Sequence, residues 1–320
     1  MPRLPSLYIV GAAKSGTTIL WEWLRHHPEI FFPSTKEPGY FAFRGLDKIS
    51  AGSEMDVNYL STLTRTRRAY TGLYEDAPVA HAMGDASPAY LYYPDAADAI
   101  HRFNPAAKII AIFRDPVARA FSQYRHNRRD GYEPAGAFQQ ALALEEERVE
   151  QGWWWGFHYR RAGLYNQQWA RFRNRFPAHQ CLALRYDDLV AAPQSVMSRI
   201  CRFVGVGDYQ VQRSEDRIND TSRLSHMPAN QAIERWFRHS SALKSSLRDL
   251  LPRHWRRYLM QQVRRLNSTP APQLGQSVVD ELRPRFRREL IDLSRSTSLD
   301  LDSWVRGTSS QVVSERNWRH

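Results

Sequence analysis

The sequence predicts an α/β fold, with a single domain in which helices flank a parallel β-sheet. Three observations support this class. Residues 7–10 form a short apolar run that ends in a glycine-bearing loop and leads into helix-like residues 17–25. Residues 108–113 are apolar and β-branched, which is typical of a buried parallel strand, and they also lead into a helix-like segment. Strand-like and helix-like segments continue to alternate, as expected for strands joined by crossover helices.

The remaining elements follow in the same alternating order. We expect strands at 30–32 and 180–186 and helices at 90–103 (with Pro94 near its start or marking a break), 118–129, 138–151, 164–176, 193–204 and 282–293. Residues 1–305 are taken as one domain, which includes a basic helical segment at 233–267. We expect residues 306–320 to form a disordered tail.

The bulk composition is that of one globular domain with an excess of positive charge. The chain has 320 residues, of which 42% are hydrophobic, and a formal net charge of +12. No apolar stretch of about 18 residues is present, and residues 1–6 lack the apolar segment of a signal peptide. Two cysteines are too few for a disulfide framework. The small number of cysteines leads us to expect a cytoplasmic protein. The positive charge suits the binding of a polyanionic nucleotide and would also suit nucleic acid or an anionic membrane surface; of these two, we expect peripheral membrane contact and no nucleic-acid partner.

Residues 11–18 predict a P-loop-like nucleotide-binding core. A strand, a loop with Gly11 and Gly16, and a helix N-terminus make an anion cradle of backbone N–H groups and helix dipole. The two glycines keep the spacing of the nucleotide P-loop, but Thr17 stands where that motif has lysine. Here the lysine, Lys14, lies inside the loop, which argues against an ordinary ATPase or GTPase.

The run Lys14-Ser15-Gly16-Thr17-Thr18 resembles the 5′-phosphosulfate loop of sulfotransferases that use PAPS (3′-phosphoadenosine 5′-phosphosulfate). The similarity is greatest to the branch that contains heparan-sulfate sulfotransferases and bacterial relatives, and it covers roughly residues 5–305. It implies that these five residues bind the donor. It also implies that Lys14 stabilises charge on the departing phosphate.

A second motif follows the strand at 108–113. Asp115 is placed to cap the next helix, with Pro116 at its first position. In the family, an arginine at the end of this strand and a serine eight residues later bind the 3′-phosphate of the donor, and Arg114 and Ser122 occupy these positions. A guanidinium fork and a hydroxyl suit phosphate oxygens. The alternative for Arg114 is an ion pair with Asp115 or Asp85.

The resemblance implies that Glu37 is the catalytic base. It lies in a Lys-Glu-Pro run before an aromatic pair, and Pro38 is expected to hold it in an extended conformation. In an in-line sulfuryl transfer the enzyme positions the reactants, stabilises charge and removes a proton from the acceptor. The alternative is that Glu37 pairs with Lys36 or Lys14 and only shapes the pocket. Because the histidines are scattered, no metal is implied.

The sequence departs from the family at Ala86, where heparan-sulfate enzymes have an active-site lysine. The neighbouring Asp85 is a candidate for binding the acceptor or orienting Lys14, or it caps the following turn. The resemblance implies a loop that closes over the 3′-phosphate, and Arg223 is the best candidate in it; the alternative is an ordinary surface arginine. Trp153 and Trp154 could stack on an acceptor or pack a helix against the sheet.

Taken with the resemblance, these residues imply a PAPS-dependent sulfotransferase. Its acceptor would be a hydroxyl, or less readily an amine, of a glycan, a lipid or a small natural product. A P-loop-type kinase or NTPase would need a Walker-type lysine that this loop lacks. A basic membrane- or polyanion-binding module would account for the charge but not for residues 14–18 and 114–122.

Overall fold

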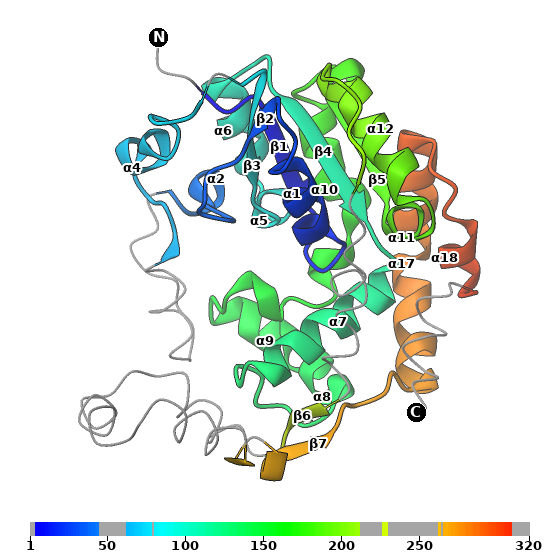
Figure 1. Ribbon diagram of the computed structural model, residues 1–320. Helices are drawn as coiled ribbons and strands as arrows, with labels where there is room; N and C mark the ends of the chain where they lie inside the picture. Colours follow the sequence, from blue (N-terminus) through cyan, green and yellow to red (C-terminus); the bar gives the residue numbers. More distant parts are fainter. Residues whose placement is uncertain are drawn as a thin grey trace, which may run out of the picture.

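The computed structural model describes residues 4–44, 62–78, 80–211, 226–229, 262–263 and 265–308. Its centre is a five-stranded parallel sheet in the order β2-β3-β1-β4-β5 (Figure 1). These strands are β1 (Leu7–Gly11), β2 (Ile30–Phe31), β3 (Ala82–Ala86), β4 (Lys108–Phe113) and β5 (Cys181–Arg185). The fold class predicted from the sequence, α/β with a parallel sheet flanked by helices, is confirmed.

Helices connect the strands and cover both faces of the sheet (Figure 1). They are α1 (Thr17–Leu24), α2 (Tyr40–Phe43), α4 (Arg67–Gly72), α5 (Ala89–Tyr92), α6 (Ala96–Phe103), α7 (Pro116–Arg129), α8 (Phe138–Ala143), α9 (Glu145–Glu150), α10 (Tyr165–Arg173), α11 (Tyr186–Ala191), α12 (Pro193–Val204), α17 (Gln276–Thr297) and α18 (Asp302–Arg306), with the 3-10 turns η1 (Trp155–Phe157), η2 (Arg161–Gly163) and η3 (Ala178–Gln180).

The central strand β1 is buried on both faces because its side chains alternate between two hydrophobic clusters. Leu7 and Ile9 pack in the cluster that contains the apolar residues of α1 and α12. Tyr8 and Val10 pack in the other cluster, which contains residues of α5, α6, α10 and α17. The sheet is thus the middle layer between two sets of helices.

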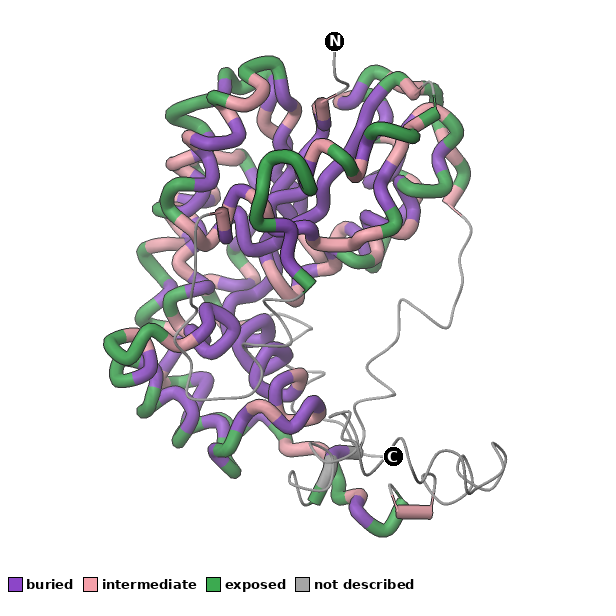
Figure 2. Tube along the Cα trace, turned by 90° about the vertical axis from the view of Figure 1, so that its left-hand side faces the viewer, coloured by how far each residue is buried: buried purple, intermediate pink, exposed green. Residues whose placement is uncertain are grey.

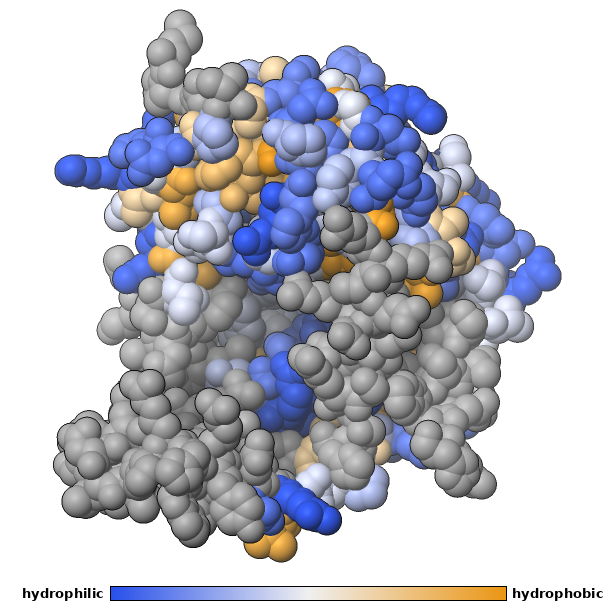
Figure 3. All heavy atoms as spheres, viewed as in Figure 1, coloured by the Kyte–Doolittle hydropathy of each residue, from blue (hydrophilic) through white to orange (hydrophobic). Residues whose placement is uncertain are grey.

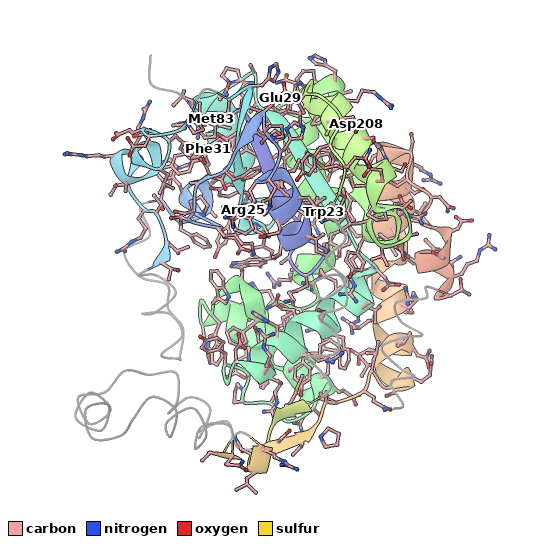
Figure 4. All side chains as sticks on the ribbon, in the orientation of Figure 1. Trp23, Arg25, Glu29, Phe31, Met83 and Asp208 are labelled. Carbon is pink, nitrogen blue, oxygen red and sulfur yellow. The ribbon has the colours of Figure 1, made fainter. Side chains whose placement is uncertain are left out.

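Strand β3 was not predicted, because its sequence, Ala-Met-Gly-Asp-Ala, contains no β-branched residue. Tertiary packing, and not local strand propensity, requires small residues in this strand. A Cβ on Gly84 would lie 2.1 Å from the Phe32 ring, so only glycine fits beneath this ring. The Gly84 carbonyl accepts a hydrogen bond from the Tyr74 hydroxyl at 3.1 Å. Figure 4 shows Phe31 and Met83 on neighbouring strands, where they are paired across β2 and β3.

A polar contact ties the turn after α1 to the loop after α12. His27 Nε2 donates to the Gly207 carbonyl at 2.9 Å, and Glu29 accepts the Gly207 N–H at 2.8 Å. Because His27 Nδ1 accepts the Glu29 N–H at 3.1 Å, both ring nitrogens have partners. Glu29 and Asp208 lie near the upper edge of the sheet in Figure 4, at the end away from α7 and α9.

Helices α7, α8 and α9 continue the buried core below the sheet (Figure 2). The helix predicted at 138–151 is split into α8 and α9 at Leu144, where φ is −80° and ψ is −6°. This prediction of one helix was wrong, because α9 turns Glu145 inward. The buried Glu145 carboxylate accepts the N–H groups of Arg160 and Arg161 at 2.8 and 2.9 Å.

A buried ion pair joins α9 to the loop after α7. Arg148 donates to both oxygens of Glu133 at 2.7 Å, and the two side chains are 3% and 0% exposed. Glu133 also accepts the Tyr159 hydroxyl at 2.7 Å. The geometry is bidentate, and further hydrogen bonds satisfy the carboxylate. These contacts offset the free-energy cost of removing both charges from water.

The long C-terminal helix α17 packs against α7, α10 and α18. It is longer than the predicted 282–293, because the buried Val278 and Val279 extend the apolar stripe toward its N-terminus. The short strands β6 (His226–Pro228) and β7 (Ser268–Pro270) pair antiparallel. In the part of the chain that the structure describes, no helix combines the length and apolar character needed to cross a bilayer. Residues 309–320, most of the predicted tail, lie outside the described residues.

We expect Glu133→Ala to lower the free energy of unfolding by about 3–5 kcal/mol, because it leaves the buried Arg148 guanidinium without its carboxylate. The matched control is Glu146→Ala, which removes an exposed ion pair with Arg161 and should cost less than about 1 kcal/mol. Urea unfolding followed by circular dichroism measures both. Equal stability of the two variants would contradict the assignment.

Candidate active site

The carboxyl ends of β1 and β4 meet at the edge of the sheet that faces α7 (Figure 1). The two strands are adjacent, with Gly11 paired to Ala111, and the chain leaves them toward opposite sides of the sheet. Open α/β sheets bind ligands at such a switch point. Both predicted phosphate motifs, at 11–18 and 114–122, begin here.

The loop between β1 and α1 has a left-handed backbone at two positions, with φ of 63° at Lys14 and 93° at Gly16. A Cβ on Gly16 would lie 2.7 Å from Leu189 Cδ2 and 3.0 Å from Tyr186 Cδ2, so the loop approaches α11 too closely for a larger residue. Gly16 is also the N-cap of α1 and provides no side-chain acceptor. The first N–H groups of α1 are therefore left to a ligand or water.

Two polar side chains of this loop are placed for an anion. Ser15 is fully buried, and its hydroxyl has no hydrogen-bond partner within the described residues. Burial, and after it the guanidinium of Arg129, lower the pKa of Lys14 to a net value of about 8, while Asp130 and Glu37 oppose the shift. Because the pKa falls despite these carboxylates, the protonated Lys14 ammonium lacks full compensation and would be stabilised by an anion.

Arg114 connects the two motifs directly. Its Nη1 donates to the Lys14 carbonyl at 3.2 Å, across about a hundred residues of sequence. Its guanidinium carbon lies 5.0 Å from the centre of the Tyr186 ring, and its own carbonyl accepts the Tyr165 hydroxyl at 2.9 Å. Arg114 is 7% exposed. The structure thus places this side chain against the loop at 14–18 rather than on the open surface.

Ser122 lies on α7, two helical turns beyond Arg114, and is 7% exposed. The start of α7 is as predicted, with Pro116 in its first turn and the Asp115 carboxylate accepting the N–H groups of residues 117 and 118 at 2.9 and 3.2 Å. Asp115 also forms a 2.7 Å ion pair with Arg283 of α17. The Asp115 carboxylate therefore fixes the turn that carries Arg114 both to the start of α7 and to α17.

Glu37 lies beside the loop, as predicted, but not in the predicted conformation. Its φ is 60°, so the expected extended backbone before Pro38 is wrong. A tight turn between β2 and α2 imposes this conformation, since Gly39 is also left-handed, with φ of 69°. The carboxylate accepts a 2.6 Å hydrogen bond from Lys36, which also donates to the Thr18 hydroxyl at 2.8 Å.

Lys36 was not among the predicted site residues, although the pairing of Glu37 with Lys36 was an alternative for Glu37. Its ammonium joins the carboxylate of Glu37 to Thr18 of the loop, and both Lys36 and Glu37 are partly exposed, at 28% and 35%. The signal in the sequence was its position in the Lys-Glu-Pro run. Arg129 was also missed; it lies near Lys14, two turns after Ser122 on the same helix.

Asp85 is 0% exposed, which does not fit the predicted contact with an acceptor. Both of its oxygens accept hydrogen bonds from hydroxyl groups of other buried residues. Burial raises the pKa of Asp85 to about 6, although these hydrogen bonds lower it. The correction follows from topology: β3 is an inner strand, so the Asp85 side chain points into the core cluster.

The tryptophans mainly pack the interior, as the alternative interpretation had it. Trp154 is 5% exposed and stacks on Phe43 at 5.4 Å, so its predicted contact with an acceptor is not supported. Trp153 is partly buried; its ring contacts Phe157 and the Arg148 guanidinium. Arg223 and most of the basic segment 233–267 lie outside the described residues, so the predicted role of Arg223 is untested.

Hydrophilic side chains gather on the visible surface between the sheet-bearing part and the lower helices (Figure 3). This is the side of the sheet to which the carboxyl ends of β1 and β4 point in Figure 1. Lys14 lies in the loop, and Lys36 and Arg114 contact the loop from two other segments. The arrangement can bind a multiply charged anion and holds one carboxylate, Glu37, beside it.

A family model described as "Sulfotransferase family" matches residues 5–211, which is more than half of the chain. A crystal structure of a sulfotransferase from Alicyclobacillus acidocaldarius aligns with a TM-score of 0.71 at 27% identity, covering 94% of this chain and 99% of that one. This neighbour has the same fold over nearly the whole chain.

Two curated relatives match parts of the sequence. Heparan sulfate glucosamine 3-O-sulfotransferase 6 of Mus musculus is 28% identical over 216 residues, covering 64% of this chain and 53% of that protein. Membrane-associated sulfotransferase kil1 of Dictyostelium discoideum is 32% identical over 121 residues, covering 38% and 22%. The chain thus spans about half of the first protein's length and less of the second's.

We expect Gly16→Ala to lower the free energy of unfolding by about 2–3 kcal/mol, because the new methyl group meets Leu189 and the left-handed backbone disfavours alanine. Gly72→Ala is the control, since a Cβ there meets nothing within 4 Å. It should change stability by no more than about 0.5 kcal/mol. Thermal unfolding compares the two. A Gly16→Ala protein as stable as the control would show that the loop is looser than described.

Proposed function

Because the chain belongs to the sulfotransferase family, we propose that it transfers a sulfuryl group from PAPS to a hydroxyl group. The observation that carries this proposal is the 3.2 Å hydrogen bond from Arg114 Nη1 to the Lys14 carbonyl. It joins the two turns that, by resemblance to PAPS-dependent enzymes, would bind opposite ends of one donor molecule. The loop at 14–18 would hold the 5′-phosphosulfate, and Arg114 with Ser122 would hold the 3′-phosphate.

Three features of the loop fit such a donor. The Ser15 hydroxyl is buried without a partner in the described part of the chain, and a phosphate oxygen would supply the acceptor. The backbone of Gly16 leaves the first N–H groups of α1 open to an anion. The lowered pKa of Lys14 indicates a site in which negative charge is missing. Each feature stabilises an anion at the same short turn.

The proposed reaction is an in-line transfer in which PAPS supplies the electrophilic sulfur. A bond forms between the acceptor oxygen and sulfur while the bond from sulfur to the phosphate oxygen breaks. Glu37 takes the proton of the acceptor hydroxyl, and the electron pair of the broken bond stays on the phosphate oxygen. Lys14 stabilises the charge that develops there.

Lys36 would replace the cation that this chain lacks at Ala86. Its ammonium lies between Thr18 Oγ1 at 2.8 Å and Glu37 Oε1 at 2.6 Å, where the donor loop meets the base. From this position it can stabilise sulfuryl oxygens and keep the Glu37 carboxylate oriented. The partial exposure of both side chains leaves room for an acceptor to approach.

The acceptor is proposed to be a glycan, with a lipid or a small natural product as alternatives and an amine as the less favoured group. The name of the heparan sulfate relative supports the glycan. A panel of desulfated heparan oligosaccharides, a long-chain alcohol and 4-nitrophenol, each incubated with labelled PAPS and read by mass gain, discriminates among these classes.

We expect adenosine 3′,5′-bisphosphate to stabilise the protein by about 2.7 kcal/mol at roughly 100 times its Kd, without added metal. Arg114→Ala should weaken binding about 10- to 100-fold, because a charged hydrogen-bonding group is lost. Arg288→Ala, at an exposed ion pair on α17, is the control and should bind normally. Thermal shift assays measure this. Stabilisation by Mg-ATP but not by the bisphosphate would favour the kinase alternative.

Glu37→Gln should lower kcat by about 10²- to 10⁴-fold, since an amide cannot accept the acceptor proton. Binding of adenosine 3′,5′-bisphosphate should stay within about twofold of wild type, because the contacts of the donor turns remain. Glu150→Gln, an exposed change on α9, serves as the control. Initial rates with labelled PAPS give kcat, and calorimetry gives Kd. Full activity in Glu37→Gln would reject Glu37 as the base.

A further inference from the structure

We propose that Asp85 is a positioning residue for Glu37, acting through Ser87 and the backbone of Gly39. The inference rests on the proposed function, because it assigns to Glu37 the role of base. None of these contacts was evident from the sequence, where Asp85 and Glu37 lie about fifty residues apart.

Within the part of the chain that the structure describes, the buried carboxylate of Asp85 is held by hydroxyl groups alone. Its side chain is 0% exposed. Oδ1 accepts the Ser87 hydroxyl at 2.6 Å, and Oδ2 accepts the hydroxyls of Tyr70 and Tyr90 at 2.8 and 2.7 Å. No lysine or arginine forms an ion pair with it within the described residues. A buried carboxylate without a cation is costly, so its retention at this place calls for a physical reason.

The hydrogen bonds that link Gly39, Ser87 and Asp85 all have the same donor-to-acceptor direction, from Gly39 to Ser87 and from Ser87 to Asp85. An ionised carboxylate only accepts, so the Ser87 proton must point to Asp85. This leaves a lone pair of Ser87 Oγ for the Gly39 N–H, which donates to it at 3.0 Å. Asp85 therefore orients the Ser87 hydroxyl as an acceptor for the backbone of Gly39. Without the carboxylate, this hydroxyl could rotate and offer its proton instead.

Gly39 is two residues from Glu37, in the turn that sets the position of the carboxylate. Glu37 and Gly39 have φ of 60° and 69°, and such a backbone is uncommon for a residue with a side chain. A strained conformation persists only where its surroundings determine it. The Ser87 contact is one restraint, and the 2.9 Å hydrogen bond from Thr64 N to the Pro38 carbonyl is another.

The surroundings of Asp85 agree with this role. Tyrosines from three elements face it: Tyr8 of β1, Tyr70 and Tyr74 in and after α4, and Tyr90 of α5, while Glu37 faces it from the turn. Burial and, to a smaller extent, the charge of Glu37 raise the pKa of Asp85, and its hydrogen bonds lower it, which gives a net value of about 6. At neutral pH the carboxylate is therefore ionised, as the direction of the hydrogen bonds requires.

The first experiment measures the turn itself and does not depend on any acceptor. Hydrogen–deuterium exchange followed by mass spectrometry reports the amide of Gly39. Ser87→Ala should increase its exchange rate by about tenfold or more, while Ser87→Thr, which keeps a hydroxyl, should retain most of the protection. Tyr124→Phe is the control, because this hydroxyl donates to the Gly136 carbonyl at 2.8 Å and Tyr124 is not one of the tyrosines that face Asp85. Unchanged protection in Ser87→Ala would overturn the proposal.

The second experiment measures transfer from labelled PAPS to the member of the acceptor panel that the wild type sulfates. Ser87→Ala and Asp85→Asn should lower kcat by about 10- to 100-fold, as expected for a misplaced base, with KM for PAPS within about twofold. Ser87→Thr should restore kcat to within about threefold of wild type. A parallel rise in KM, or wild-type kcat in both variants, would overturn the positioning role. A wild type that binds no bisphosphate and transfers nothing would instead refute the proposed function, and this role with it.

Discussion

The hydrogen bond between the Arg114 guanidinium and the Lys14 carbonyl is the interaction on which the proposed site depends. It exists because β1 and β4 are adjacent parallel strands, so the turns that follow them leave the sheet side by side. The Tyr186 ring lies under the guanidinium, and Tyr165 holds the Arg114 carbonyl. A large aromatic surface thereby limits where this cation can point, and the backbone of the loop limits how far it can withdraw.

The C-terminal helices stabilise this pair of turns from outside. Arg283 of α17 forms an ion pair with Asp115, the cap of α7, and donates to the Trp304 carbonyl. The Trp304 indole donates to Asp187 at 2.7 Å, next to the tyrosine that lies under Arg114. Burial raises the pKa of Asp115, and the charge of Arg283 opposes that rise. The helix pair α17–α18 therefore supports the arginine turn on two sides, although it contributes no residue to the loop.

Local chemistry decided which parts could be predicted from the sequence. The apolar strands at 7–10 and 108–113 and the Asp115 cap carry their signals within a few residues. Strand β3 does not, because Gly84 is small to fit Phe32, a contact between distant segments. The same holds for the site: the loop at 14–18 was predicted by its own residues. The left-handed turn at Glu37 and the hydroxyl groups that surround Asp85 are brought into place only when separate elements pack together.

The attachment of α17 and α18 also bears on synthesis of the protein by the ribosome. Strands β1 and β4 emerge early, but the carboxylate that caps α7 meets its cationic partner only after residue 283 has left the exit tunnel, and the indole at 304 follows still later. Domains fold as the chain emerges, and segments that lack their partners stay open until those partners appear. The turn that carries Arg114 thus gains its outer support only after all five strands of the sheet have been synthesised.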